Sequence, residues 1–177
     1  MTEKLAVNAY GRLTEPQTLV IERLLPGPAS RIWAYLTDSD LRRQWLASGA
    51  MEEKAGAAFE LVWRNDELTD PPGNRPEGFG EEMRMKSRVL ELQKDKRLVF
   101  TWGETGEVCF DLRPEGDEVL LTVTHRRISD RANLLMVGAG WHMHLDILKA
   151  KVTGGKTAPF WDGWLKLKSD YDARLPG

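Results

Sequence analysis

The feature that most restricts the fold is a run of four apolar segments between residues 83 and 126, each separated from the next by only a few residues. The segments read MRMKSRVLEL, RLVFTW, EVCFDLR and EVLLTVTHR. Apolar side chains alternate along them, which is typical of strands with one buried face. The separators contain Gly, Asp or Pro, which favour tight turns. Sequential strands joined in this way predict an antiparallel meander.

A long helix is predicted directly after the meander. Between residues 132 and 153 the apolar side chains follow the i, i+3, i+4, i+7 spacing of a helix lying on a sheet: Val137, Trp141, His144, Leu145, Leu148 and Val152. Such a helix would be roughly 33 Å long at 1.5 Å per residue. Gly154 and Gly155 form a typical stop signal. Residues 159–175 repeat the pattern and predict a second helix, packed on this domain or on a partner chain.

The N-terminal part predicts another strand and two short helices. Residues 17–25 are rich in branched apolar side chains, and Pro26-Gly27-Pro28 ends that strand. Helical spacing then continues to Asp38, which can cap a second short helix, and residues 58–63 alternate as a further strand. We therefore predict an α+β fold in which a curved antiparallel sheet of six to seven strands surrounds a long C-terminal helix, with two short helices after the first strand.

Length and charge restrict the other possibilities. The 177 residues are expected to form one domain, with a core over residues 17–155 and a helical extension over residues 156–177. The 25 basic and 27 acidic side chains nearly cancel, which argues against a nucleic-acid partner. No apolar run approaches the roughly 18 residues of a membrane span, so we expect a cytoplasmic protein without membrane insertion. The single cysteine, Cys109, is expected to pack as a small apolar side chain.

One long polar segment interrupts the strands. Residues 64–82 contain three prolines and three glycines, with Leu68 and Phe79 as the large apolar side chains. A loop of this length within a compact domain is either a functional lid or a mobile insertion. The sequence leaves both possibilities open.

Four stretches of the sequence resemble a known family. They are IERLLPGPASRIWAYLTDSDLRRQWL (21–46), RLVFTW (97–102), LRPEGDEVLLTVTH (112–125) and GAGWHMHLDILKAKVTGG (138–155). These stretches, and the chain over residues 17–155, resemble the activator of Hsp90 ATPase homologue type of the START/Bet v 1-like (SRPBCC) superfamily. The resemblance implies a helix-grip fold. It leaves activity open, since the superfamily includes lipid, hormone and polyketide binders, a few cyclases and co-chaperones.

Seven tryptophans are the compositional feature that most needs an explanation. Each buries a large ring and carries an indole N–H that needs a partner. Several fall on predicted inner elements, where they either fill the core or line a pocket between the sheet and the helix. The residues that we predict to line such a pocket are Trp33, Trp63, Met85, Trp102, Phe110, Trp141, His144, Leu145 and Leu148.

The three histidines give only weak candidates for catalysis. His142 and His144 are two residues apart on a helix, so they point in nearly opposite directions and cannot share a metal ion. His125 would meet His144 if its strand faces the helix, and the two would then be the acid and base of an enclosed site. Asp146 is expected to point elsewhere. No catalytic motif is present in the sequence, and we predict neither a metal nor a cofactor.

The predicted function is the binding of a small hydrophobic molecule in a cavity between sheet and C-terminal helix, without catalysis. One alternative is a co-chaperone-like protein-interaction role, for which an exposed aromatic patch including Trp161 and Trp164 would be the sign. Another is an acid/base enzyme that uses His144 and His125 on an enclosed polyketide-like substrate. A homodimer through the terminal helix is left open.

Overall fold

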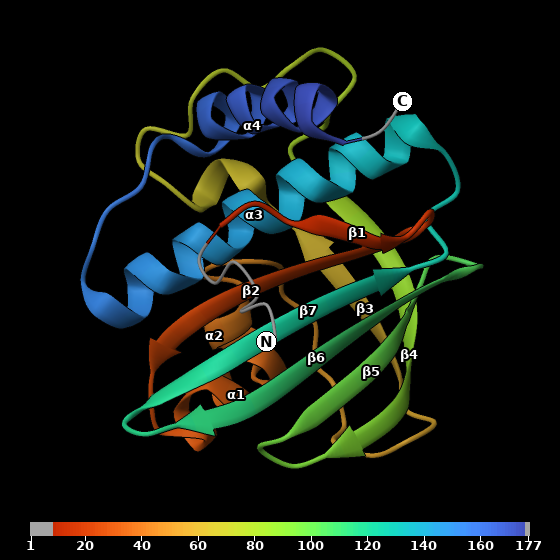
Figure 1. The fold of residues 1–177 in the computed structure, drawn as a ribbon, viewed down its shortest axis with the longest axis vertical. Coiled ribbons are helices and arrows are strands. Elements are labelled where there is room, and N and C mark those ends of the chain that lie inside the picture. The colour runs from red at the N-terminus through yellow and green to blue at the C-terminus, as the bar shows by residue number, and fades with distance from the viewer. Residues whose placement is uncertain (1–8, 176–177) are drawn as a thin grey trace, which may run out of the picture.

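The computed structural model describes residues 9–175 and confirms the predicted α+β fold (Figure 1). Its sheet has seven antiparallel strands in the order β1-β2-β7-β6-β5-β4-β3. In chain order the strands are β1 (Arg12–Glu15), β2 (Thr18–Pro26), β3 (Ala58–Trp63), β4 (Met83–Gln93), β5 (Arg97–Trp102), β6 (Gly106–Glu115) and β7 (Glu118–Arg126). The last strand of the meander, β7, pairs with β2, and β1 pairs with the other side of β2 at the edge of the sheet. The sheet curves over the helices (Figure 1).

The helices are α1 (Ala29–Thr37), α2 (Ser39–Arg42), the 3-10 turn η1 (Asn65–Glu67), α3 (Arg131–Thr153) and α4 (Phe160–Arg174). Figure 1 shows the long α3 against the curved sheet and α4 beyond α3. The second terminal helix therefore packs on its own chain, where it buries Phe160, Trp161, Trp164 and Tyr171.

Local signals explain the bounds of α3. The Asp130 carboxylate accepts a hydrogen bond from the Asn133 N–H at 2.8 Å, which satisfies a free amide of the first turn. The helix ends at Gly154, whose φ of 75° is the left-handed conformation that favours glycine. These are the bounds that the sequence predicts to within one residue.

The end of the molecule under α1 and α2 is filled by side chains. Trp45 is fully buried, and Leu36, Phe59, Leu98 and Phe100 surround a residual space of only about 10 Å³. A gap of that size holds at most a single water molecule. This end is therefore packed core, and any larger cavity lies elsewhere along α3.

The polar loop of residues 64–82 is bound to the start of α4. The Phe160 N–H donates to Thr69 Oγ1 at 2.8 Å, and the Trp161 N–H donates to the Pro72 carbonyl at 2.9 Å. A Cβ on Gly73, whose φ is 82°, would lie 2.9 Å from the Asp162 nitrogen, so this close approach requires glycine. The loop and α4 thus cover the molecule as one unit.

A buried polar chain fixes α4 to α3 and to the N-terminal segment. The Gly11 N–H donates to the Tyr171 hydroxyl at 2.7 Å, and that hydroxyl lies 2.9 Å from His142 Nδ1. His142 Nε2 lies 3.5 Å from Asp146, which pairs with the buried Arg23 at 3.0 Å. Asp146 therefore binds Arg23 and His142, and it points away from His144 as the sequence predicts.

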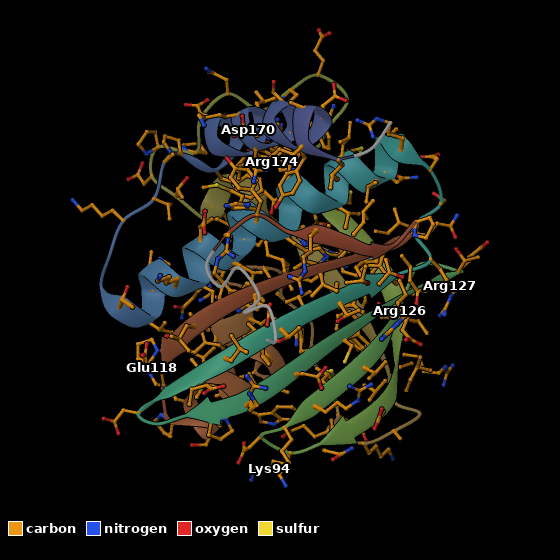
Figure 2. The ribbon with its side chains drawn as sticks, in the orientation of Figure 1. Lys94, Glu118, Arg126, Arg127, Asp170 and Arg174 are labelled. Carbon is orange, nitrogen blue, oxygen red and sulfur yellow. The ribbon has the colours of Figure 1, made fainter. Side chains whose placement is uncertain are left out.

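Charged side chains cover the outside of the fold (Figure 2). Asp170 and Arg174 on α4 lie over the N-terminal segment, where Asp170 accepts a hydrogen bond from the Tyr10 hydroxyl at 2.9 Å. At the end of β7, Arg126 and Arg127 both pair with Glu107. Each of these exposed pairs contributes little to stability, so most of the stability of the fold comes from buried contacts.

Candidate functional site

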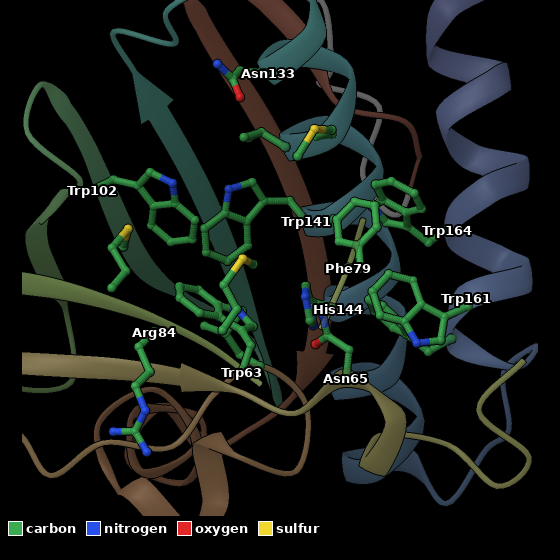
Figure 3. Close-up of a pocket in the computed structure, with 17 residues that line it drawn as sticks. Trp63, Asn65, Phe79, Arg84, Trp102, Asn133, Trp141, His144, Trp161 and Trp164 are labelled. Atoms are coloured by element: carbon green, nitrogen blue, oxygen red, sulfur yellow. The ribbon is translucent and has the colours of Figure 1, made fainter. Parts of the chain in front are cut away.

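A pocket of about 320 Å³ lies between α3 and strands β3–β5, under the loop and α4 (Figure 3). One face of the first half of α3 forms its floor, because the lining positions there recur at helical spacing. The residues that line it are Leu46, Trp63, Asn65, Phe79, Met83, Arg84, Met85, Trp102, Asn133, Met136, Val137, Gly140, Trp141, His144, Phe160, Trp161 and Trp164.

Aromatic rings form two facing walls of this pocket. On the sheet side, the Trp102 ring centroid lies 5.4 Å from that of Trp63 and 5.5 Å from that of Trp141. On the other side, Phe79 lies 5.3 Å from both Trp161 and Trp164, and Figure 3 shows these two groups on opposite sides. Two such walls are suited to a flat apolar molecule between them.

His144 is the polar side chain at the base of the pocket. Its Nδ1 lies 2.7 Å from the Trp45 carbonyl oxygen, which can only accept, so Nδ1 carries the proton. Burial lowers the pKa of His144 to about 4. The ring is therefore neutral near pH 7, and its Nε2 presents a lone pair.

His125 is separated from His144 by its own bonding. The Trp141 indole N–H donates to His125 Nδ1 at 3.0 Å, and burial lowers the pKa of His125 to about 4. His125 does not belong to the described pocket lining. The two histidines have separate partners: β7 directs His125 to the indole of Trp141, while α3 directs His144 to the carbonyl of Trp45.

Arg84 is the one charged residue among the described lining residues. Its guanidinium pairs with Glu82 at 2.7 Å and with Glu60 at 2.9 Å, and the hydrogen bond that it donates to Glu82 raises its pKa. The side chain is more than half exposed. The interior of the pocket therefore has no uncompensated charge.

The structure places the predicted lining residues in two groups. Trp63, Met85, Trp102, Trp141 and His144 line the pocket, whereas Trp33, Phe110, Leu145 and Leu148 do not and are buried in the core. The Trp33 indole donates to Glu53 at 2.7 Å, and Phe110 packs behind Trp141 with centroids 5.7 Å apart. Apolar periodicity marks the inward face of a helix or strand, and it does not separate core positions from pocket positions. One element can face the packed core at one point along its length and the pocket at another.

Sequence reasoning missed the residues that cover the pocket. Asn65 and Phe79 come from the loop, and Trp161 and Trp164 come from α4. The available signal was Phe79, a large aromatic side chain in an otherwise polar segment. Trp161 and Trp164 are only 3% and 5% exposed, so the exposed aromatic patch expected of a chaperone-type surface does not form from these two rings.

Other chemistries have little support in the described part of the chain. Residues 9–175 contain no group of three or more His, Cys, Asp or Glu side chains arranged to hold a metal ion. Burial raises the pKa of Cys109 to about 12, as expected for a packed thiol. No helix within the same residues combines the length and apolar character needed to cross a membrane.

A curved antiparallel sheet around a long C-terminal helix, with a pocket between them, defines a protein of the helix-grip, Bet v 1-like class. The sequence profile of the family described as "Activator of Hsp90 ATPase homolog 1-like protein" matches residues 26–153. The chain belongs to this family.

Solved structures share the fold. The protein encoded by gene BPP1335 from Bordetella parapertussis is 34% identical, with 100% of this chain and 97% of that chain covered and a TM-score of 0.77. CalU16 from Micromonospora echinospora is 23% identical over 93% of this chain and 94% of its own, with a TM-score of 0.66. EF2215 from Enterococcus faecalis, a conserved protein of unknown function, is 22% identical, with 93% of this chain and 88% of that chain covered and a TM-score of 0.68. The search of curated proteins found no match.

Proposed function

We propose that this protein binds a small hydrophobic molecule between the two aromatic walls of the pocket. The observation that carries the proposal is the pocket itself: about 320 Å³, enclosed by α3, the sheet and α4, and lined by rings on opposite sides. Ligand sites of this size are typically apolar with a few polar groups. The START/Bet v 1-like superfamily, which the sequence resembles, includes binders of such molecules, and this supports the same role here.

The indole N–H groups distinguish the pocket from ordinary core. Four of the seven tryptophans donate to a residue of the chain, namely Trp33, Trp45, Trp141 and Trp161. Trp63, Trp102 and Trp164 make no such bond within residues 9–175, and all three line the pocket. Their nitrogens are not among the buried side-chain atoms that lack a partner, so these N–H groups reach accessible space, where water or a bound molecule can accept from them.

Two flexible side chains lie at the rim. Met83 on β4 is 52% exposed and Met136 on α3 is 37% exposed, and both belong to the lining. Exposed methionines are adaptable apolar contacts that suit a binding surface. We take this side as the entrance.

Binding accounts for the site better than acid/base turnover. His144 has no second titratable side chain beside it in the lining other than the paired Arg84. A group with a pKa of about 4 is a poor proton acceptor at neutral pH, where an efficient catalytic base has a pKa near the operating pH.

Gly140→Leu tests the proposal by filling the pocket. Gly140 lies on the pocket face of α3, and a Cβ there would meet nothing closer than Trp164 Nε1 at 3.9 Å, so a longer side chain extends into the cavity. We expect the variant to remain folded and to bind the neutral probe N-phenyl-1-naphthylamine at least about tenfold more weakly in a fluorescence titration, a loss of about 1.4 kcal/mol.

Ala132→Leu is the matched control, because Ala132 is an exposed position of the same helix outside the lining. It should bind the probe like the wild type. Native mass spectrometry of wild type purified from its own host should show a bound small molecule that Gly140→Leu lacks. Equal probe binding by both variants and the wild type would contradict the proposal.

A further inference from the structure

The polar atoms inside the pocket specify more than apolar contact. His144 Nε2 presents a lone pair, because the Trp45 carbonyl fixes the proton on Nδ1. Within residues 9–175 this Nε2 makes no hydrogen bond. This nitrogen is not among the buried side-chain atoms that lack a partner, so the base of the pocket offers an accessible acceptor that is held in a fixed orientation.

Asn65 supplies a second acceptor at the same pocket. Its Oδ1 is buried and has no hydrogen-bond partner among the described residues, an arrangement that is energetically costly unless a donor is supplied. The turn that carries it is held in place: the Leu68 N–H donates to the Asn65 carbonyl, and the neighbouring Asp66 accepts from the Trp161 indole at 2.7 Å. Figure 3 shows Asn65 and His144 among the side chains that line the pocket.

The role of His144 is independent of the Asn65 amide. Turning that amide would exchange its oxygen and nitrogen, whereas the carbonyl of Trp45 can accept only and so fixes the imidazole. His144 alone therefore favours a donor on the ligand, and the buried Asn65 oxygen strengthens the same preference.

The charges of the site exclude an anionic ligand from its interior. Burial lowers the pKa of His144, which is neutral near pH 7, and Arg84 at the rim is already paired with two carboxylates. A carboxylate drawn into this pocket would lose its water without gaining a cation. A fatty acid or other anion is therefore disfavoured.

We infer that the ligand is a neutral aromatic molecule with hydroxyl or N–H groups, which donate to His144 Nε2 and to Asn65 Oδ1 while its ring lies between the two aromatic walls. This inference rests on the proposed binding function and adds the chemistry that selects the ligand. It assigns His144 and Asn65 as specificity-determining residues.

Three probes of similar shape test the inference: 2-naphthol, which has a donor, 2-methylnaphthalene, which lacks one, and 2-naphthoate, which is charged. The methyl compound is more hydrophobic than 2-naphthol, so their absolute affinities cannot be compared directly. The measured quantity is therefore the ratio of the 2-naphthol affinity to the 2-methylnaphthalene affinity near pH 7, and this ratio is compared between wild type and variants. The variant His144→Asn keeps an amide N–H that can reach the Trp45 carbonyl and removes the Nε2 acceptor. Asn65→Leu keeps the shape of the side chain and removes the oxygen.

Because 2-naphthol has one donor hydrogen, we expect the variant that removes its acceptor to lower this ratio by about tenfold, the effect of one lost hydrogen bond, with 2-methylnaphthalene binding nearly unchanged. 2-Naphthoate should bind wild type most weakly of the three. His142→Asn is the matched control, since it makes the same change on the same helix but faces Tyr171, and it should leave the ratio as in wild type.

An unchanged ratio in both His144→Asn and Asn65→Leu would overturn the inference and leave the binding function standing, provided that Gly140→Leu still weakens probe binding. Preferred binding of 2-naphthoate would also overturn it. Failure of wild type to bind any of the three probes would reject the inference and the proposed function together.

Discussion

Single hydrogen bonds decide what the buried aromatic and imidazole groups do in this protein. Trp141 is fixed by His125, and His144 is fixed by the carbonyl of Trp45. A neutral imidazole offers one donor and one acceptor, so each bond determines what the other ring nitrogen can do. This is why two buried histidines with similarly lowered pKa values have different roles.

The same reasoning predicts the effect of Tyr171→Phe. The Tyr171 hydroxyl is the partner of both the Gly11 N–H and His142 Nδ1, and its loss leaves two buried polar groups unsatisfied. We expect the free energy of unfolding to fall by about 1–3 kcal/mol, measured by urea denaturation.

Tyr10→Phe provides the comparison for that experiment. The Tyr10 hydroxyl donates to Asp170 in a half-buried position, where water can replace the lost partner, so the change should be under about 1 kcal/mol. A smaller effect of Tyr171→Phe than of Tyr10→Phe would show that the buried chain does not hold α4.

Among the elements, the loop and α4 together form the cover of the pocket. The hydrogen bonds from Phe160 and Trp161 join the start of the helix to residues 69 and 72 of the loop. Phe79 and Asn65 of the loop and Trp161 and Trp164 of the helix all reach the same cavity. A contact that separates the two elements should therefore open the pocket without unfolding the sheet.

Gly73→Ala creates such a contact, because the new Cβ would lie 2.9 Å from the backbone nitrogen of Asp162. Gly78→Ala is the matched control: Gly78 also has a positive φ, 91°, but a Cβ there meets nothing within 4 Å. Both changes carry the backbone strain of a left-handed residue, and only the first also pushes loop and helix apart. We expect several-fold faster release of N-phenyl-1-naphthylamine in stopped-flow measurements for Gly73→Ala alone, and equal release rates in the two variants would contradict the coupling of loop and helix.

For the whole molecule, the buried histidines make stability depend on pH. Burial lowers the pKa of His125, His142 and His144 to about 4, below the value of about 6.5 for an exposed histidine. As the pH falls, the unfolded chain therefore takes up these protons first, and stability is lost between about pH 6.5 and pH 4. Carboxylates such as Glu82 and Asp170 have lowered pKa values, so they act below this window.

We expect the free energy of unfolding to decrease by more than roughly 2 kcal/mol between pH 7 and pH 4.5, measured by urea denaturation at several pH values. His125→Leu should reduce the slope of this decrease, because one of the titrating groups is gone, whatever its effect on stability at pH 7. A constant free energy across this window would show that the three rings are protonated alike in both states.

The sequence by itself determined the α+β class, the strand meander and the long helix, since alternation, helical spacing and turn residues are local properties of the chain. It also identified Trp63, Met85, Trp102, Trp141 and His144 as lining residues, because these lie on regular elements with a defined inner face. Only the tertiary structure decided that Leu145 and Leu148 belong to the core, that His125 bonds Trp141, and that α4 with the loop brings Asn65, Phe79, Trp161 and Trp164 to the pocket. Those outcomes depend on contacts between segments up to about a hundred residues apart, and no local pattern encodes the path by which an irregular loop meets a terminal helix.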